Sequence, residues 1–113
     1  MLIPFMDGRE NGMKWLETIK LQSASGMESA SERELHGLGN EVRNSPDHRG
    51  SLEAIVYNHT SVPGYFAIRF FWSTGPPQLQ GSPLGMRITQ TLKTFGLVDH
   101  SVWIEKGKKG EEV

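Results

Sequence analysis

Residues 51 to 72 read SLEAIVYNHTSVPGYFAIRFFW, two runs of β-branched and aromatic residues separated by a turn sequence. Runs of this composition are typical of β-strands. Pro63 and Gly64 suit the two central positions of a type II turn, because proline presets its own φ and glycine accepts the positive φ that follows. The segment therefore predicts an antiparallel hairpin with strands near residues 52 to 59 and 65 to 72.

Upstream of the hairpin, residues 13 to 22, MKWLETIKLQ, alternate between two sides. One side is richer in apolar residues and contains Trp15, Glu17, Ile19 and Leu21. Side chains that alternate in this way are expected of a strand with one face toward a core. We therefore predict the first strand here.

A helix is predicted between this strand and the hairpin. Ser25 with Glu28, and Ser29 with Glu32, have the S-x-x-E spacing of a capping box, so the helix is expected to begin between Ser25 and Ser29. Its apolar stripe consists of Met27, Ser31, Leu35, Leu38 and Val42. The sequence NSPDHRG, residues 44 to 50, then ends it.

A second helix and a last strand are predicted downstream, in GSPLGMRITQTLKTFGLVDHSVWIE, residues 81 to 105. Ser82 is placed to cap the helix, Pro83 suits the first helical position, and Gly96 suits a left-handed C-terminal position. The apolar stripe is Leu84, Ile88, Leu92 and Phe95. A glycine-flanked helix start can also bind phosphate, but no phosphate-loop or dinucleotide motif is present, so a helix cap is favoured.

The order strand, helix, strand, strand, helix, strand predicts an α+β, ferredoxin-like fold. Right-handed crossovers then give a four-stranded antiparallel sheet in spatial order 4-1-3-2 with both helices on one face. The expected domain covers residues 13 to 106, between an N-terminal arm (1 to 12) and a flexible charged tail (107 to 113).

Composition narrows the classes of function. The chain has 113 residues, 12 Lys and Arg against 13 Asp and Glu, and no cysteine. This charge balance disfavours nucleic-acid partners, and no apolar run approaches the length of a membrane span. The absence of cysteine suits a cytoplasmic protein. One domain is expected from this length.

The face of the sheet away from the helices is predicted to be apolar and aromatic. In residues 65 to 72, neither alternating side is polar, and Trp103 and Tyr57 fall on the second face by the same alternation. Soluble monomers rarely expose a large apolar patch. We therefore expect a second copy of the chain to cover this face, as in a homodimer.

The chain resembles the dimeric α/β-barrel superfamily of antibiotic-biosynthesis-monooxygenase-like and stress-responsive barrel proteins. The resemblance lies in this order of elements, in the hairpin of residues 51 to 72 and in the C-terminal sequence LKTFGLVDHSVWIE. The resemblance covers about residues 13 to 106 and is one of fold. It implies a homodimer whose sheets enclose a lumen, used by some members for cofactor-free oxygenation of aromatic substrates and by others for haem binding or isomerisation. It does not carry over one activity, because one fold hosts many chemistries.

The candidate ligand-binding residues are Tyr57, His59, Arg69 and Trp103 on the presumed lumen face, with Glu17 as a neighbour able to pair with Arg69 if the register matches. They could orient a small aromatic, apolar or carboxylate ligand, and His59 could act as a base because imidazole titrates near neutral pH. The alternative interpretation is that they form ion pairs and hydrogen bonds at a dimer interface.

No catalytic residue can be assigned from a motif. Asp99, His100 and Ser101 are neighbours on a strand and point to alternate faces, so they cannot form a relay. No metal-binding pattern is present, and no cofactor is expected, although haem and flavin stay open. An enzyme, a non-enzymatic binding module and a monomer that docks another partner all remain hypotheses, with a monooxygenase-like oxidoreductase as the enzymatic form.

Overall fold

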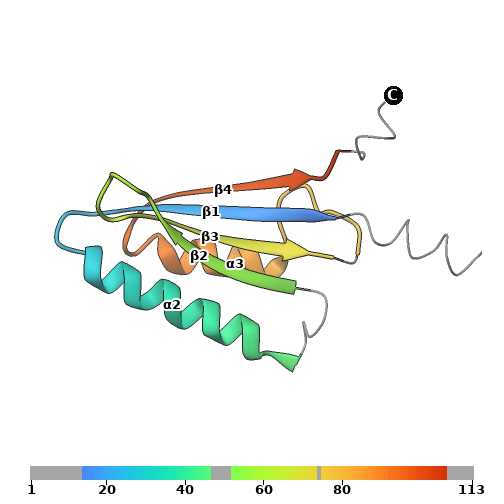
Figure 1. Cartoon of the computed structure of the whole chain (residues 1–113), viewed down its shortest axis with the longest axis horizontal. Helices are drawn as coiled ribbons and strands as arrows, with labels where there is room; N and C mark the ends of the chain where they lie inside the picture. Colours follow the sequence, from blue (N-terminus) through green and yellow to red (C-terminus); the bar gives the residue numbers. More distant parts are fainter. Residues whose placement is uncertain (1–13, 47–51, 74, 107–113) are drawn as a thin grey trace, which may run out of the picture.

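The computed structural model describes residues 14–46, 52–73 and 75–106. Its elements are β1 (Trp15–Ser23), α2 (Glu28–Asn44), β2 (Leu52–Asn58), β3 (Tyr65–Trp72), α3 (Pro83–Leu92) and β4 (Gly96–Ile104) (Figure 1). The predicted order of elements is confirmed. The predicted arm and the tail, residues 1–12 and 107–113, lie outside the described residues. No helix in the described ranges is long and apolar enough to cross a membrane.

The four strands form one antiparallel sheet in the order β2-β3-β1-β4, as predicted. Both helices lie on the same side of this sheet (Figure 1). Helix α2 packs mainly against β2, and α3 against β4 and β1. The sheet therefore has one covered face and one face that no helix of the described chain covers.

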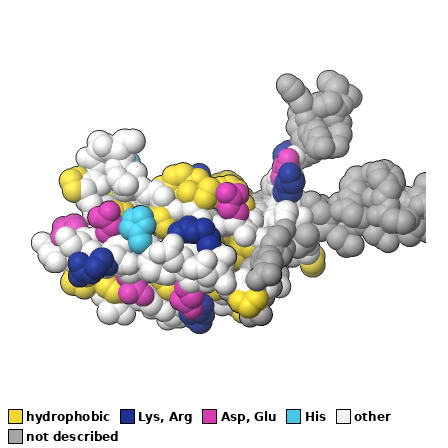
Figure 2. Space-filling model, turned by 60° about the horizontal axis from the view of Figure 1, so that its bottom comes forward, with side chains coloured by type: hydrophobic (Ala, Val, Ile, Leu, Met, Phe, Trp, Pro, Cys, Tyr) yellow, Lys and Arg dark blue, Asp and Glu magenta, His cyan; other side chains and the backbone are white. Residues whose placement is uncertain are grey.

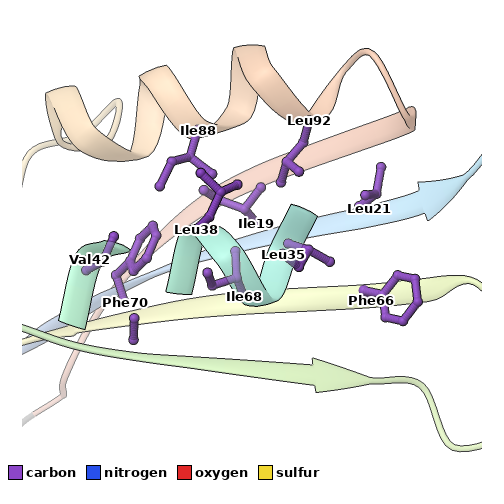
Figure 3. Close-up of a cluster of buried hydrophobic side chains, with 11 residues drawn as sticks. Ile19, Leu21, Leu35, Leu38, Val42, Phe66, Ile68, Phe70, Ile88 and Leu92 are labelled. Carbon is purple, nitrogen blue, oxygen red and sulfur yellow. The ribbon is translucent and has the colours of Figure 1, made fainter. Parts of the chain in front are cut away.

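The hydrophobic core lies between the covered face and the two helices (Figure 3). Alternation along β3 turns Phe66, Ile68 and Phe70 toward the helices, and all three are buried. The core consists of Ile19, Leu21, Leu35, Leu38, Val42, Ala54, Phe66, Ile68, Phe70, Ile88 and Leu92. Full burial of such a side chain contributes about 1.5 to 3 kcal/mol, so this layer holds the helices on the sheet.

The hairpin turn is confirmed at the predicted residues. The amide of Tyr65 donates to the carbonyl of Val62 at 3.3 Å, and Gly64 has a φ of 77°. Pro63 and Gly64 are thus the central residues of the turn. A Cβ on residue 64 would lie 2.7 Å from Glu28 Cγ, so space as well as backbone conformation favours glycine.

Helix α2 begins within the predicted interval, but the capping-box prediction is wrong. Met27 is the N-cap, and it makes no side-chain cap hydrogen bond. Gly26, with a φ of 85°, turns the chain directly before the helix, so Ser25 lies in a turn instead of at the cap. The predicted stripe is buried except for Met27, which is half-buried at the N-cap, and Gly39 is buried as well. Ser31 in this stripe accepts a hydrogen bond from Ser23 Oγ at 2.8 Å.

Helix α3 confirms one terminal prediction and overturns the other. Ser82 Oγ accepts from the amide of Gly85 at 2.9 Å, and Pro83 follows at the first helical position. Gly96, however, is the first residue of β4 and does not have a positive φ. A Cβ there would overlap the carbonyl oxygen of Gln22, so this glycine permits close approach of β4 to β1.

Candidate ligand-binding face

The side of the sheet opposite the helices, which we call the uncovered face, is formed by alternate residues of all four strands. These are Leu16, Thr18, Lys20, Gln22, Glu53, Ile55, Tyr57, Tyr65, Ala67, Arg69, Phe71, Leu97, Asp99, Ser101 and Trp103. Tyr57, Leu97 and Trp103 are 39%, 75% and 60% exposed. On the side turned forward in Figure 2, acidic and basic side chains are interspersed with hydrophobic ones.

Arg69 lies near the middle of the uncovered face, in a row with Ile55, Thr18 and Ser101 across the four strands. Its guanidinium carbon is 5.2 Å from the centroid of the Tyr57 ring, a cation–π contact. Arg69 Nε is buried and has no hydrogen-bond partner. Within the described ranges, Arg69 forms no ion pair. Arg69 is half-buried, and its guanidinium contacts the Tyr57 ring instead of a carboxylate.

Two hollows of the uncovered face meet at Arg69. One, of about 350 Å³, is lined by Tyr57, His59 and Tyr65 together with Lys20 and Arg69. The other, of about 330 Å³, is lined by Trp103 and Ser101 on β4, with Lys20 and Arg69 again on its side. Four of the predicted residues thus border these hollows, and Arg69 joins the two groups.

His59 lies at the turn end of the uncovered face. Its Nδ1 accepts hydrogen bonds from the amides of Ser61, at 3.1 Å, and Val62, at 3.0 Å. Its ring stacks on Tyr65 with centroids 5.3 Å apart. Because Nδ1 is an acceptor, the neutral imidazole carries its proton on Nε2. Only Nε2 is available for a ligand, and the ring also serves to close the turn.

Trp103 lies between two hollows. Its Nε1 donates to Ser101 Oγ at 2.9 Å, which fixes the ring on the uncovered face. It also borders a larger hollow, of about 710 Å³, at the end of the sheet where β1 begins. Trp15 and Trp72 line the same hollow, and their rings stack with centroids 5.3 Å apart. Four of the eleven residues that line this hollow are aromatic, and the others include aliphatic and charged side chains.

Glu17 does not belong to the uncovered face, and the predicted pairing with Arg69 is wrong. In the register of β1 with β3, Thr18 lies opposite Arg69, whereas Glu17 lies opposite Phe70 and points toward the helices. A strand alternates its side chains, so neighbouring residues serve opposite faces. Glu17 is completely buried.

Four side chains form what we call the Glu17 cluster: Glu17, Trp72, Ser82 and His100. Glu17 Oε2 accepts from Trp72 Nε1 at 2.9 Å and from Ser82 Oγ at 2.5 Å. Glu17 Oε1 lies 2.8 Å from His100 Nε2. Ser82 and His100 contact different oxygens of one carboxylate, which differs from a catalytic relay, where the serine contacts the imidazole. The cluster is a closed set of charge-assisted hydrogen bonds.

The Glu17 cluster also explains the glycines at the start of α3. A Cβ at Gly85 would overlap Glu17 Oε1, and one at Gly81 would overlap the ring of His100. The carboxylate therefore occupies the N-terminal end of the helix, where a negative charge is favourable. This geometry supports the helix-cap interpretation, because the position that a phosphate would take is filled by Glu17.

Sequence reasoning missed this cluster, although one signal was present. Glu17 shares a side of its strand with Trp15, Ile19 and Leu21, and that side was the more apolar one. The apolar side of a strand faces the core, so the carboxylate had to be buried with partners. The partners Ser82 and His100 are far away in sequence. Among the described residues, no group of His, Asp or Glu is arranged to hold a metal ion.

Solved structures share this fold at low sequence identity. No family model matches the chain, and no curated protein matches it in sequence. A candidate antibiotic biosynthesis monooxygenase from Deinococcus radiodurans is 18% identical, with a TM-score of 0.60 over 83% of this chain and 93% of that one. A dimeric ferredoxin-like protein from an uncultured marine organism is 14% identical, with a TM-score of 0.52 over 92% and 96%.

A third similar structure is a variant of SnoaB, a cofactor-independent oxygenase from Streptomyces nogalater. It is 5% identical, with a TM-score of 0.52 over 85% of this chain and 96% of that one. The chain therefore has the ferredoxin-like fold of the antibiotic-biosynthesis-monooxygenase-like proteins, as the resemblance in sequence indicated. At these identities the likeness concerns the fold alone.

Proposed function

We propose that two copies of this chain pair through their uncovered faces and enclose a lumen that binds a small aromatic or apolar molecule. One observation carries the proposal: Tyr57, Leu97 and Trp103 are exposed on a sheet face that no helix covers. A patch of this kind is a typical interaction surface. A two-fold axis lets the same patch serve both partners.

The enzymatic form of the proposal is a cofactor-free, monooxygenase-like reaction in the lumen. It is supported by the fold shared with an oxygenase that needs no cofactor. Such chemistry balances when a substrate methylene becomes a carbonyl: one atom of O₂ enters the product and the other leaves as water, and the substrate supplies all four electrons. Arg69 would orient the substrate, and the Nε2–H of His59 would donate a hydrogen bond to a substrate oxygen.

The alternative is a non-enzymatic binding or interaction module. It is favoured by the structural role of His59, whose Nδ1 accepts hydrogen bonds from two amides of the turn. In this form Arg69 and Tyr57 stabilise the interface between the two copies. The two forms differ in what a substitution at Arg69 should change.

Sedimentation velocity at micromolar concentration tests the pairing. We expect the mass of a dimer for the native chain and of a monomer for Trp103→Lys, because the charge would be buried in the interface. Leu79→Lys is the control, since Leu79 is 88% exposed and lies outside the sheet. A native monomer, or equal dissociation by both variants, would refute the pairing.

Turnover and ligand binding separate the two forms. A thermal-shift screen with quinones, phenols and haem identifies ligands, because a ligand that binds the folded state raises its melting temperature. Oxygen uptake with any phenol that binds then tests catalysis, because oxidation of the ring CH₂ of its keto tautomer to a carbonyl gives one quinone and one water per O₂. The enzymatic form predicts that Arg69→Ala and His59→Ala abolish uptake while the dimer persists. The alternative predicts that Arg69→Ala weakens the dimer itself.

A further inference from the structure

The two hollows that meet at Arg69 have an unbalanced charge. Lys20 and Arg69 line both of them, and the described residues that line either hollow include no Asp or Glu. Asp99 lies opposite Lys20 in the register of β1 with β4, but the two form no ion pair among the described residues. Glu53 borders the separate hollow at the end of the sheet. The two hollows are therefore lined by two cations and no carboxylate, while Asp99 lies on the same face outside them.

Pairing of two copies would concentrate this charge. A two-fold axis would bring two Arg69 and two Lys20 side chains into one lumen, away from bulk water, together with the two Asp99 side chains that lie beside Lys20 on the same face. Burial of a charge without a partner is unfavourable, and Arg69 Nε already lacks a hydrogen-bond partner. An anion inside the lumen would remove this cost, because a guanidinium binds a carboxylate through two parallel hydrogen bonds.

The walls of the hollows indicate the rest of the ligand. Tyr57 and Tyr65 offer aromatic surface on one side of Arg69, and Trp103 offers it on the other. Volumes of about 350 Å³ and 330 Å³ are at the small end of ligand pockets. They suit a planar molecule of one or two rings. We infer that the ligand of this face is an aromatic acid, whose carboxylate or ionised hydroxyl pairs with Arg69 and Lys20 while its ring packs on Trp103 or Tyr57. This inference rests on the proposed function.

A matched pair of probes tests the charge of the ligand. 2-Naphthoate and 2-naphthamide have the same ring and nearly the same shape, but only the first is an anion at pH 7.5. Isothermal titration calorimetry on the native chain is expected to give 2-naphthoate a Kd at least about tenfold lower, as one charge-assisted contact would produce. Arg69→Met should abolish the preference, because the affinity for 2-naphthoate should fall to that for 2-naphthamide. Lys93→Met removes an exposed cation at the C-cap of α3 and should retain the preference.

Each outcome bears on a different claim. If both probes bind equally to the native chain, the inference is wrong and the proposed aromatic lumen stands. If Lys93→Met reduces the preference as much as Arg69→Met, the effect is general charge and the inference is also wrong. If neither probe binds and sedimentation shows a monomer, the proposed function and the inference are both refuted.

Discussion

The two faces of the sheet differ in whether their charged side chains have hydrogen-bond partners. On the covered face, the buried carboxylate of Glu17 has a partner for each oxygen: Trp72, Ser82 and His100. On the uncovered face, Arg69 has a buried Nε without a partner and only the Tyr57 ring beside its charge. A satisfied network is typical of structure, and an unsatisfied one is typical of a surface that something else completes.

This contrast arises between adjacent residues of one strand. Glu17 and Thr18 follow each other in β1, and Thr18 lies opposite Arg69. The pleat therefore separates a stabilising cluster from a candidate binding site by a single residue. Substitutions on the two faces should differ in kind: those on the covered face should lower stability, and those on the uncovered face should alter binding and assembly.

The largest effect is expected for Glu17→Ala. Removal of the carboxylate deprives Trp72 Nε1 and Ser82 Oγ of the acceptor that they share, and loss of the acceptor costs about 1 to 3 kcal/mol for each buried donor. Urea unfolding followed by circular dichroism measures the change. Glu32→Ala is the control, because Glu32 is 59% exposed and should change stability by less than about 0.5 kcal/mol. Equal losses would show that the Glu17 cluster is not stabilising.

Gly85→Ala should have the next largest effect. The new methyl group would overlap Glu17 Oε1 in the buried cluster, and overpacking of this kind costs about 1 to 3 kcal/mol. Gly37→Ala is the matched control in α2, where a Cβ meets nothing within 4 Å. It should raise the free energy of unfolding by up to about 1 kcal/mol. Opposite signs for the two variants in the same urea titration would support the contrast, and a neutral Gly85→Ala would contradict it.

Ser82→Ala should cost about 0.5 to 2 kcal/mol, because the helix loses its cap. The sharper comparison is Ser82→Asp. Aspartate is ordinarily as good an N-cap as serine, but here its carboxylate would replace a hydroxyl that lies 2.5 Å from Glu17 Oε2. We expect the melting temperature of Ser82→Asp to be no higher than that of Ser82→Ala. A higher melting temperature for Ser82→Asp than for Ser82→Ala would mean that Ser82 acts only as the N-cap of α3 and not through its contact with Glu17.

The smallest effect on stability is expected for Arg69→Met without ligand. Methionine keeps most of the apolar stem and removes an unpaired buried Nε, while the cation–π contact with Tyr57 is lost. These changes oppose each other, so the free energy of unfolding should change by less than about 1 kcal/mol. Calorimetric melting checks this. A loss as large as that of Glu17→Ala would place Arg69 among the stabilising residues and would weaken the case for a ligand.

Short sequence patterns predicted the helices and strands better than they predicted the residues at which these begin and end. Pro63 with Gly64, and Ser82 with Pro83, act through their own backbone and nearest amides, so their roles were visible in the sequence. The S-x-x-E spacing at Ser25 failed because Gly26 turns the chain before α2 begins. Gly96 was misassigned because glycine is required there by the close approach of the β1 backbone and not by the end of α3.

The sequence by itself determined the six elements, their order and the presence of aromatic residues on both faces of the sheet, because alternation, helical periodicity and turn chemistry act within a few residues. Alternation also placed Arg69 on the face away from the helices. Only the tertiary structure decided that Glu17 is buried with Ser82 and His100, which lie 65 and 83 positions away in the chain. The satisfaction of a buried charge depends on such distant partners, and local pattern does not reveal them.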